Sequence, residues 1–268
     1  MKKIKVVVTG ASGRMGQTVI KKVINDKSLK LIGATEIAGH KNIGLDLGKV
    51  LKVKKIGIKI SENILPLFAK TDVVIDFTLP KATLEHVKIA AQARIIHVIG
   101  TTGFNNNQLK KIKYAAKHAT IIKSGNMSLG VNLLEKLITQ AASKLDASFN
   151  IEVNEIHHKH KIDAPSGTAL MMATAAAKGR NVNLEKVKKI SRINTKRGRQ
   201  KNKIVLSSFR KGKVVGNHEV VFSSADEIIT LEHSALDRGI FASGAIHAAK
   251  WGYGKNPGLF TMADVLGL

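Results

Sequence analysis

Short apolar runs alternate with amphipathic stretches through the first half of the chain. Residues 4–9 form a β-branched run that predicts a strand, a glycine-rich turn follows, and residues 29–35 predict a second strand. Between them, apolar residues recur with helical spacing and share one face: Met15, Val19, Val23 and Ile24. The chain therefore opens with a strand–helix–strand unit, which is typical of an α/β fold.

The same alternation continues as far as residue 123. Strands are predicted over residues 73–77, 95–99 and 120–123, and helices over residues 82–93 and 107–118. Strands this apolar belong to a parallel sheet that is covered by helices on both faces. The first half of the chain is thus predicted to be an α/β domain with a doubly wound parallel sheet.

The pattern changes after a predicted helix over residues 129–145. Phe149, Ile151 and Val153 alternate with polar residues, as in a strand that is exposed on one face. Further elements are predicted along the rest of the chain: a helix over residues 168–178 and strands over residues 204–209, 214–222 and 227–234. We expect a second, smaller α+β domain that begins near residue 129, with a mostly antiparallel sheet and one helix against it.

Composition narrows the function classes. The chain has 268 residues and no cysteine, which excludes disulfides, thiolate metal sites and a catalytic thiol. The first ten residues lack the apolar core of a signal peptide, and no run approaches the ~18 apolar residues of a membrane span. We therefore expect a cytoplasmic protein that does not cross a membrane.

The chain is strongly basic, with a net charge of +25. This charge admits nucleic acid, anionic lipid or an acidic small molecule as a partner. Between residues 186 and 203, nine of eighteen residues are Lys or Arg, which we interpret as a solvated loop. Aromatic residues make up only 4%, too few for the stacking platforms of a single-stranded nucleic-acid binder. A basic nucleic-acid-binding protein is the alternative, but no specific nucleic acid is expected.

The turn after the first strand has the spacing of a phosphate-binding loop. Gly10, Gly13 and Gly16 let the backbone turn tightly and approach a pyrophosphate at the start of a helix. Glu36 follows 20 residues after Gly16, where a carboxylate can hold ribose hydroxyls, although Ser12 stands where glycine is preferred. The motif favours a Rossmann-like dinucleotide-binding domain. The alternative is a plain βα turn with a solvated Glu36.

The residues beside Glu36 favour NADH. A carboxylate repels a 2′-phosphate, and Ile37 supplies no positive charge to offset it, while Lys41 and Arg14 keep NADPH possible. Two later turns, over residues 100–103 and 124–127, also follow predicted strands. Because ligands of such sheets lie at the carboxyl ends of the strands, these turns are expected to hold the nicotinamide.

A second group of candidate residues lies between Glu155 and Thr168, where three histidines fall within four residues. If strand periodicity persists, His157 lies on one face of the strand, and His158 and His160 lie on the other. The three cannot converge on one metal, and a zinc site would need distant carboxylates, so no metal is predicted. An imidazole with a nearby lysine and a Ser-Gly-Thr helix start suits an acidic substrate. A solvated basic loop is the other interpretation.

Several motifs together resemble those of the 4-hydroxy-tetrahydrodipicolinate reductase family, also called dihydrodipicolinate reductases. They are the turn over residues 10–16, Asp76-Phe77-Thr78, residues 100–104, and above all Glu155 to Ala169. The resemblance continues through residues 215–218, 241–245, 258–260 and 265–268, so it spans nearly the whole chain. Many relatives carry an arginine where this chain has Ile37, which puts a preference for NADPH in doubt.

The resemblance implies a cytoplasmic homotetramer of lysine and diaminopimelate biosynthesis. Such an enzyme passes a hydride from NAD(P)H to a cyclic imine dicarboxylate after loss of its 4-hydroxyl. By position, His157 would be the acid/base, Lys161 the proton donor, and the substrate carboxylates would be held by His158, Gly167 and Thr168. The residues that would hold the cofactor are Gly10, Ala11, Ser12, Gly13, Arg14, Met15, Glu36, Gly100, Thr101, Thr102, Ser124, Gly125, Asn126 and Met127.

The resemblance also implies that different domains of the chain have different functions. Residues 1–128 would bind the dinucleotide, residues 129–238 would bind substrate and build the tetramer, and residues 239–268 would return to the first domain. A different NAD-dependent oxidoreductase on the same fold is the second alternative, because a fold does not determine a substrate. Aspartate-semialdehyde dehydrogenase is excluded by the absence of cysteine.

Overall fold

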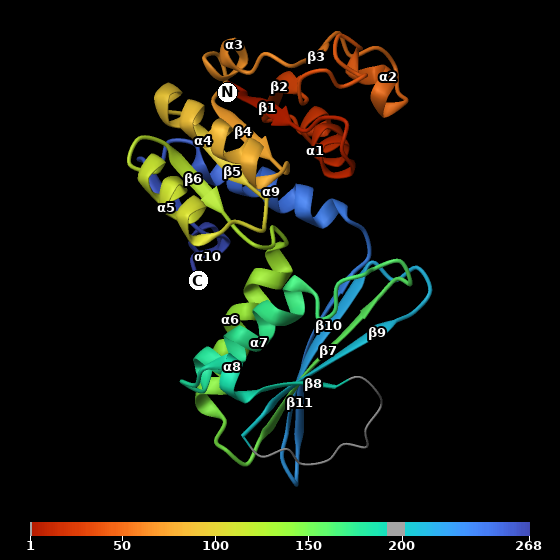
Figure 1. Ribbon diagram of the computed structural model, residues 1–268, viewed down its shortest axis with the longest axis vertical. Coiled ribbons are helices and arrows are strands. Elements are labelled where there is room, and N and C mark those ends of the chain that lie inside the picture. The colour runs from red at the N-terminus through yellow and green to blue at the C-terminus, as the bar shows by residue number, and fades with distance from the viewer. Residues whose placement is uncertain (1, 192–201) are drawn as a thin grey trace. The chain divides into compact units, whose positions relative to one another are not determined.

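The computed structural model describes residues 2–191 and 202–268 (Figure 1). The chain divides into two compact units. The first comprises Met1–Ser128 and Gly239–Gly267, and the second comprises Leu129–Arg238 together with Leu268. Within the described residues, no helix is both long enough and apolar enough to span a bilayer.

The first unit contains a sheet of seven parallel strands in the order β12-β6-β5-β4-β1-β2-β3. The strands are β1 (Ile4–Thr9), β2 (Leu29–Thr35), β3 (Ile60–Ser61), β4 (Val73–Asp76), β5 (Ile96–Ile99), β6 (Thr120–Lys123) and β12 (Gly258–Phe260). The predicted parallel sheet is confirmed. From the neighbouring strands β1 and β4, the order runs outward through β2 and β3 on one side and through β5, β6 and β12 on the other, as in doubly wound Rossmann-like folds.

Helices cover both faces of this sheet. They are α1 (Arg14–Asn25), α2 (Leu47–Leu51), α3 (Leu65–Phe68), α4 (Pro80–Ala93), α5 (Asn106–Ala115), α9 (Gly239–Gly252) and α10 (Met262–Leu266). Val87 of α4 and Ile112 of α5 pack with Ile99 of β5 on one face. On the other face, α9 approaches β5 and β6 so closely that a Cβ on Gly252 would lie within 3.1 Å of Ile96.

The buried face of α1 differs from the predicted one by one residue position. Val19 and Val23 are buried as expected, but Ile20 is buried in place of Ile24, which is 43% exposed. Gly16 is the cause, because a Cβ there would lie 2.0 Å from the carbonyl oxygen of Gly10. The helix therefore turns its glycine side, and not Ile24, towards the sheet.

The second unit contains a five-stranded sheet in the order β11-β10-β7-β9-β8. Its elements are α6 (Leu129–Lys144), β7 (Asn150–His157), α7 (Gly167–Gly179), α8 (Leu184–Val187), β8 (Lys188–Ser191), β9 (Ile204–Arg210), β10 (Gly216–Ser223) and β11 (Ile228–Ala235). Strands β11, β10 and β7 pair antiparallel, whereas β7, β9 and β8 pair parallel. The expectation of a mostly antiparallel sheet is therefore wrong. The sheet is mixed because the crossover through α7 returns the chain parallel to β7.

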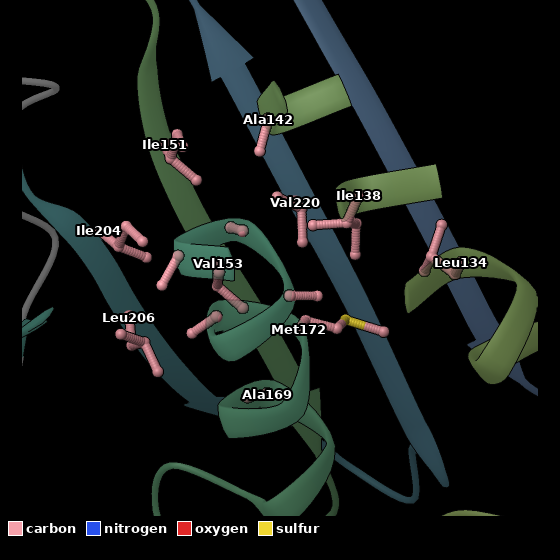
Figure 2. Packing of buried hydrophobic residues seen from close by; sticks show 14 of the residues in the cluster. Leu134, Ile138, Ala142, Ile151, Val153, Ala169, Met172, Ile204, Leu206 and Val220 are labelled. Carbon is pink, nitrogen blue, oxygen red and sulfur yellow. The ribbon is translucent and has the colours of Figure 1, made fainter. Parts of the chain in front are cut away.

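Two helices, and not the expected one, form the core of this unit with the sheet. Figure 2 shows Ile138 of α6 and Met172 of α7 beside Val153 and Val220 of the central strands. The alternate residues of β7 are buried in this core, which is the period-two pattern of a strand that is covered on one face. The helices therefore determine which face of β7 is withdrawn from water.

The basic stretch over residues 186–203 is only partly described. Residues Lys188–Ser191 form β8, so the interpretation of the whole stretch as a loop is wrong for this part. Ile190 follows two lysines there and pairs with Leu206 of β9, which gives the segment a sheet partner. Residues 192–201, on which the rest of that interpretation falls, lie outside the described residues.

Replacing Ile138 tests the core of the second unit. Its side chain is 0% exposed, so Ile138→Ala leaves a cavity and should lower the free energy of unfolding by about 2–5 kcal/mol. Leu137, the next residue of α6, is 40% exposed, and Leu137→Ala should cost about 1 kcal/mol or less. Urea denaturation followed by circular dichroism measures both. Equal losses in the two variants would contradict the described packing.

Candidate active site

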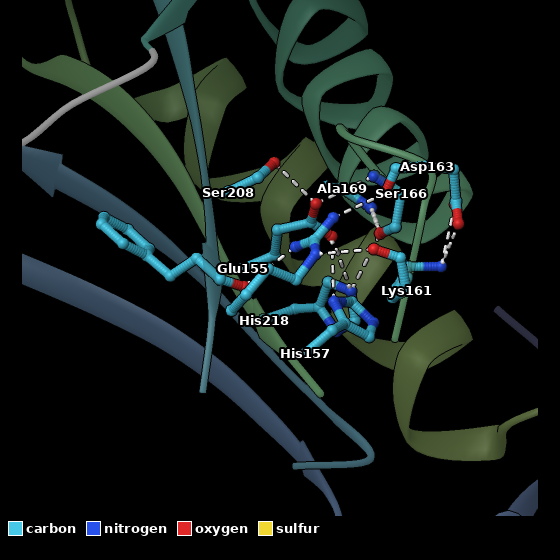
Figure 3. A network of polar contacts seen from close by, with 10 residues as sticks. Glu155, His157, Lys161, Asp163, Ser166, Ala169, Ser208 and His218 are labelled. Atoms are coloured by element: carbon cyan, nitrogen blue, oxygen red, sulfur yellow. Dashed lines mark hydrogen bonds and ion pairs between the residues drawn. The ribbon is translucent and has the colours of Figure 1, made fainter. Parts of the chain in front are cut away.

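Three buried polar side chains gather on the helix-covered face of the second sheet (Figure 3). Glu155 and His157 lie two residues apart on β7, and His218 of β10 lies directly across from Glu155 in the strand register. Their exposed fractions are 0%, 7% and 5%, respectively. Strand periodicity places Glu155 and His157 on the same face, and strand pairing adds His218.

The Glu155 carboxylate ties this strand to the start of α7. Its Oε1 accepts hydrogen bonds from the backbone N–H of Ser166, at 2.9 Å, and from the hydroxyl of Ser208, at 2.7 Å. The hydroxyl of Ser166 in turn accepts a hydrogen bond from the backbone of Ala169 and caps the helix. The carboxylate therefore holds the helix N-terminus beside β7 and β9.

The other carboxylate oxygen faces two imidazoles. Glu155 Oε2 lies 3.4 Å from His157 Nδ1 and 3.6 Å from His218 Nε2. The two rings meet edge to face, with centroids 4.9 Å apart. A Cβ on Gly216 would lie 3.0 Å from His157 Nε2, so glycine at this position leaves room for the imidazole.

Burial and neighbouring charges determine the protonation of the cluster. Burial favours the neutral form of Glu155, but contacts with His218, Ser166 and Ser208 outweigh it and lower the pKa of Glu155 to about 2. Burial and repulsion from His218 lower the pKa of His157 to about 4, against the attraction of Glu155. Near neutral pH the site therefore presents an anionic Glu155 and a neutral imidazole that can accept a proton.

The loop after β7 carries Lys161. Its Nζ lies 2.8 Å from a carboxylate oxygen of Asp163, and the guanidinium of Arg210 donates hydrogen bonds to the backbone oxygens of both residues. Arg210 pairs with His157 in the register of β7 and β9, so it joins the loop of Lys161 and Asp163 to the strand end that carries His157. Two cationic side chains thus stand near the neutral imidazole.

The remaining predicted substrate residues lie at the strand end and the helix start. His158 follows β7 and has its ring 6.2 Å from that of His160. Gly167 begins α7, and the space where its Cβ would be is open. Because the first N–H groups of a helix lack intrahelical partners, this end of α7 suits a carboxylate.

The metal alternative can be compared with this geometry. The ligating atoms of Glu155, His157 and His218 lie within 4.8 Å of one another. This is not the group of neighbouring histidines weighed from the sequence, because His158 and His160 take no part in it. Ser166 and Ser208 already occupy Glu155 Oε1, and Ser166 Oγ lies 3.2 Å from His218 Nε2. Glu155 Oε1 and His218 Nε2 thus have protein partners, whereas Glu155 Oε2 and His157 Nδ1 have no hydrogen-bond partner within the described residues.

In the first unit, the turn between β1 and α1 has the shape that a pyrophosphate requires. Gly10 has a φ of +68°, and Gly13 caps the helix with its backbone alone. No acidic residue occupies the first turn of α1, so nothing competes for its free N–H groups. Ala11, Ser12, Arg14 and Met15 belong to the same turn and helix start. The arrangement fits a dinucleotide.

Glu36 is held beside this turn. Its Oε2 accepts a hydrogen bond of 2.8 Å from the backbone N–H of Ser12, and its Oε1 accepts one of 3.1 Å from Ile37. Both bonds fix the carboxylate where the second strand ends, the position expected for a group that binds ribose hydroxyls. Ile37 is 73% exposed and adds no charge.

The two later turns differ in how their residues can reach a ligand. Gly100 packs under the ring of Phe77, Thr101 is buried, and Thr102 is exposed. In the other turn, Ser124, Gly125 and Asn126 are at least partly exposed. Met127 is only 1% exposed, so its side chain belongs to the core and only its backbone can face a ligand.

Sequence reasoning did not select Glu155, Ser208, His218, Asp163 or Arg210 as site residues. The burial of Glu155 could be predicted from the sequence, since Glu155 lies in the same alternation as Ile151 and Val153. The other four residues could not be predicted in this way. Their places depend on the pairing of β7 with β9 and β10 or on the fold of a loop.

Comparisons with known proteins agree over the whole chain. The family model described as Dihydrodipicolinate reductase, N-terminus, matches residues 4–127, and the model described as Dihydrodipicolinate reductase, C-terminus, matches residues 130–266. The 4-hydroxy-tetrahydrodipicolinate reductase of Parvibaculum lavamentivorans is 53% identical over 266 residues, covering 99% of this chain and 98% of that protein. The one from Brucella abortus is 49% identical over 263 residues, covering 98% of each.

Solved structures give the same result. A dipicolinate-bound dihydrodipicolinate reductase from Paenisporosarcina sp. TG-14 superposes with a TM-score of 0.78 at 28% identity, covering 98% of both chains. An amine dehydrogenase from Mycobacterium smegmatis superposes with a TM-score of 0.62 at 11% identity, covering 97% of this chain and 95% of that one. The second similarity concerns the fold alone.

Replacing Glu155 tests the electrostatics of the cluster. Glu155→Gln keeps an oxygen for Ser166 and Ser208 but removes the charge that favours protonated His157, so the pKa of His157 should fall further below about 4. Glu152→Gln, on the opposite face of the same strand, should leave that pKa unchanged. Histidine titration by NMR measures both. A His157 pKa that rises in Glu155→Gln, or moves equally in the control, would contradict the described contacts.

Proposed function

This chain belongs to the dihydrodipicolinate reductase family, and we propose on that premise that it reduces 4-hydroxy-tetrahydrodipicolinate to tetrahydrodipicolinate, with loss of water, in the diaminopimelate and lysine pathway. It is an NAD(P)H-dependent oxidoreductase. The observation that carries the proposal is the buried cluster of Glu155, His157 and His218 beside the open start of α7. Both features lie within the residues that the C-terminal family model matches.

His157 and Lys161 are the proposed catalytic residues. When bound, the reduced nicotinamide supplies a hydride, which reaches the electrophilic carbon of the cyclic imine. The Lys161 ammonium, held by Asp163, is placed to donate a proton to the substrate. The neutral imidazole of His157, kept so by burial and by His218, is placed to accept a proton and pass it on.

His158, Gly167 and Thr168 are the proposed ligands of the two substrate carboxylates. Gly167 and Thr168 begin a 13-residue helix, whose dipole favours an anion at its N-terminus. Ser166 is already engaged with Ala169 and Glu155, so it fixes the helix start without blocking the residues after it. The high net charge of +25 favours the approach of a dianionic substrate.

The turn after β1 and the loops after β5 and β6 are the proposed cofactor site, and NADH is the proposed preferred cofactor. Glu36 stays at the edge of the turn through its hydrogen bonds with Ser12 and Ile37. A 2′-phosphate would meet this carboxylate, and Ile37, the residue after Glu36, carries no charge to offset the repulsion. A 2′-hydroxyl can instead donate a hydrogen bond to it.

A homotetramer built by the second unit is the proposed assembly. The helices α6 and α7 cover one face of the five-stranded sheet, which leaves the other face to a partner. That face carries Val205, Phe209 and Val221 among polar residues, and Phe209 is 38% exposed. A mixed apolar and polar sheet face of this kind suits pairing with a second copy of the chain.

Turnover with the pathway substrate tests the activity. Wild-type enzyme should oxidise NADH only when the upstream synthase supplies substrate from pyruvate and aspartate semialdehyde. Lys161→Ala should lower kcat/KM by about 10²–10⁴-fold, because the proton donor is lost. Lys159→Ala, an exposed lysine two residues earlier, is the control and should stay within a few-fold of wild type. Near-normal turnover in Lys161→Ala would refute its role, and no turnover by folded wild type with either cofactor would refute the proposed reaction.

Replacing Ile37 tests the cofactor preference. Ile37→Arg places a cation beside Glu36, so kcat/KM for NADPH relative to NADH should rise about tenfold. Ile37→Gln is a control with a polar side chain but without the charge, and its ratio should match that of wild type. Steady-state kinetics with each cofactor measures the ratio. Wild-type enzyme that prefers NADPH would contradict the argument from Glu36.

A further inference from the structure

A second buried carboxylate, which the proposed hydride and proton transfers do not use, lies in the first unit. Asp76 ends β4 and is 0% exposed. Its Oδ2 lies 2.8 Å from His86 Nδ1 of α4 and 3.2 Å from His97 Nε2 of β5. His97 is also 0% exposed, and His86 is 9% exposed. A carboxylate and two imidazoles thus share one buried site beside the carboxyl end of β4.

The other oxygen of Asp76 holds the loop that follows it. Asp76 Oδ1 accepts hydrogen bonds from the backbone N–H of Thr78, at 2.9 Å, and from its hydroxyl, at 2.6 Å. The hydroxyl of Thr101 lies 3.5 Å from the same oxygen and 3.3 Å from the backbone oxygen of Thr78. Asp76 therefore links the ends of β4 and β5 at the level of their loops.

Thr83 closes this network from α4. Its hydroxyl donates a hydrogen bond of 2.9 Å to the hydroxyl of Thr101 and lies 3.2 Å from that of Thr78. Thr83 is 0% exposed, so no water competes for these bonds. The hydroxyls of Thr78, Thr83 and Thr101 and the carboxylate of Asp76 consequently form one connected hydrogen-bond network.

The segment that Asp76 fixes contacts both proposed cofactor loops. A Cβ on Gly10 would lie 2.9 Å from Thr78 Cγ2, and a Cβ on Gly100 would lie 2.1 Å from the ring of Phe77. Phe77 and Thr78 therefore pack against both Gly10, in the proposed pyrophosphate turn, and Gly100, in the proposed nicotinamide loop. Any displacement of Thr78 displaces the surfaces on which the cofactor would lie.

We propose that Asp76 is a positioning residue for the dinucleotide, which sets the spacing between the Gly10 turn and the loop of residues 100–102 through Thr78, Thr83 and Thr101. Asp76 is fully buried, so it acts through these side chains and does not touch the cofactor. The inference rests on the proposed function, because it assumes that those two loops hold NAD(P)H.

The electrostatics agree with this role. Burial alone would raise the pKa of Asp76, but His86 and His97 hold it well below its usual value, so the carboxylate stays anionic. Burial lowers the pKa of His97, which leaves that ring neutral near Asp76. Apolar packing can replace a buried carboxylate together with its partners at little cost, whereas removal of the carboxylate alone leaves those partners unpaired. The hydroxyl network requires a carboxylate at position 76, because an apolar side chain cannot accept the hydrogen bonds of Thr78.

Asp76→Asn is the first test. An amide cannot accept hydrogen bonds from the imidazoles and Thr78 together, so the Kd for NADH should rise about tenfold, as expected when a supporting contact of a binding site is lost. The KM for NADH should rise in parallel, while the KM for the dicarboxylate, whose proposed ligands belong to the second unit, should stay unchanged. Fluorescence titration with NADH and steady-state kinetics supply these values.

Two further variants separate positioning from stability. Thr83→Val keeps the buried carboxylate and the side-chain shape but removes the hydroxyl that joins those of Thr78 and Thr101, so it should also weaken NADH binding several-fold. Thr71→Val removes a buried hydroxyl that donates to the backbone oxygens of Lys5 and Val73, at the opposite edge of the same sheet. This control should lower the melting temperature without changing the Kd for NADH.

The outcomes distinguish this inference from the proposed function. Folded wild type that binds neither NADH nor NADPH would refute the proposed function. Wild type that binds NADH, with Asp76→Asn and Thr83→Val within twofold of it, would overturn the positioning role and leave the function intact. If Asp76→Asn does not fold, Thr83→Val decides. A Kd raised equally in Thr71→Val would also overturn the inference, because general loosening of the sheet would then explain the loss.

Discussion

The hydrogen bonding of one buried carboxylate organises the proposed chemistry. Glu155 binds the backbone of Ser166 and the hydroxyl of Ser208 through one oxygen and faces His157 and His218 with the other. Removing a carboxylate from water is costly unless such partners are present. Once they are present, they hold strand, helix start and imidazole in one geometry. In this geometry, burial and repulsion from His218 keep His157 neutral against the attraction of Glu155. The start of α7 is held with open space beside Gly167.

The two units use the same device for different ends. Asp76 and Glu155 both lie on strands that are buried by helices, and each faces two histidines while its other oxygen holds a segment that follows or neighbours the strand. In the first unit the held segment supports two glycine-rich loops, whereas in the second it is the helix N-terminus. In both cases the hydrogen bonds of a buried carboxylate fix the position of the held segment relative to the strand.

The local sequence pattern predicted the bounds of a strand correctly where they depend on that segment alone. The strands Ile4–Thr9, Leu29–Thr35 and Thr120–Lys123 have the predicted bounds, because each is a short apolar segment bounded by polar or glycine-rich turns. The buried face of α1 was misjudged because Gly16, which has no side chain, is the residue that approaches Gly10 most closely. The parallel pairing of β7 with β9 was missed because alternation along a strand is the same for either direction of its partner.

The sequence by itself determined the class of the first sheet, the glycine turn with Glu36, and the face of β7 that carries His157, since each follows from backbone geometry over a few residues. The resemblance of its motifs added the reaction. Only the tertiary structure decided that His218 and Ser208 meet Glu155, and that His97 and Thr101 meet Asp76. These contacts join residues separated by up to 63 positions between Glu155 and His218, and strand register, which no local pattern specifies, brings them together.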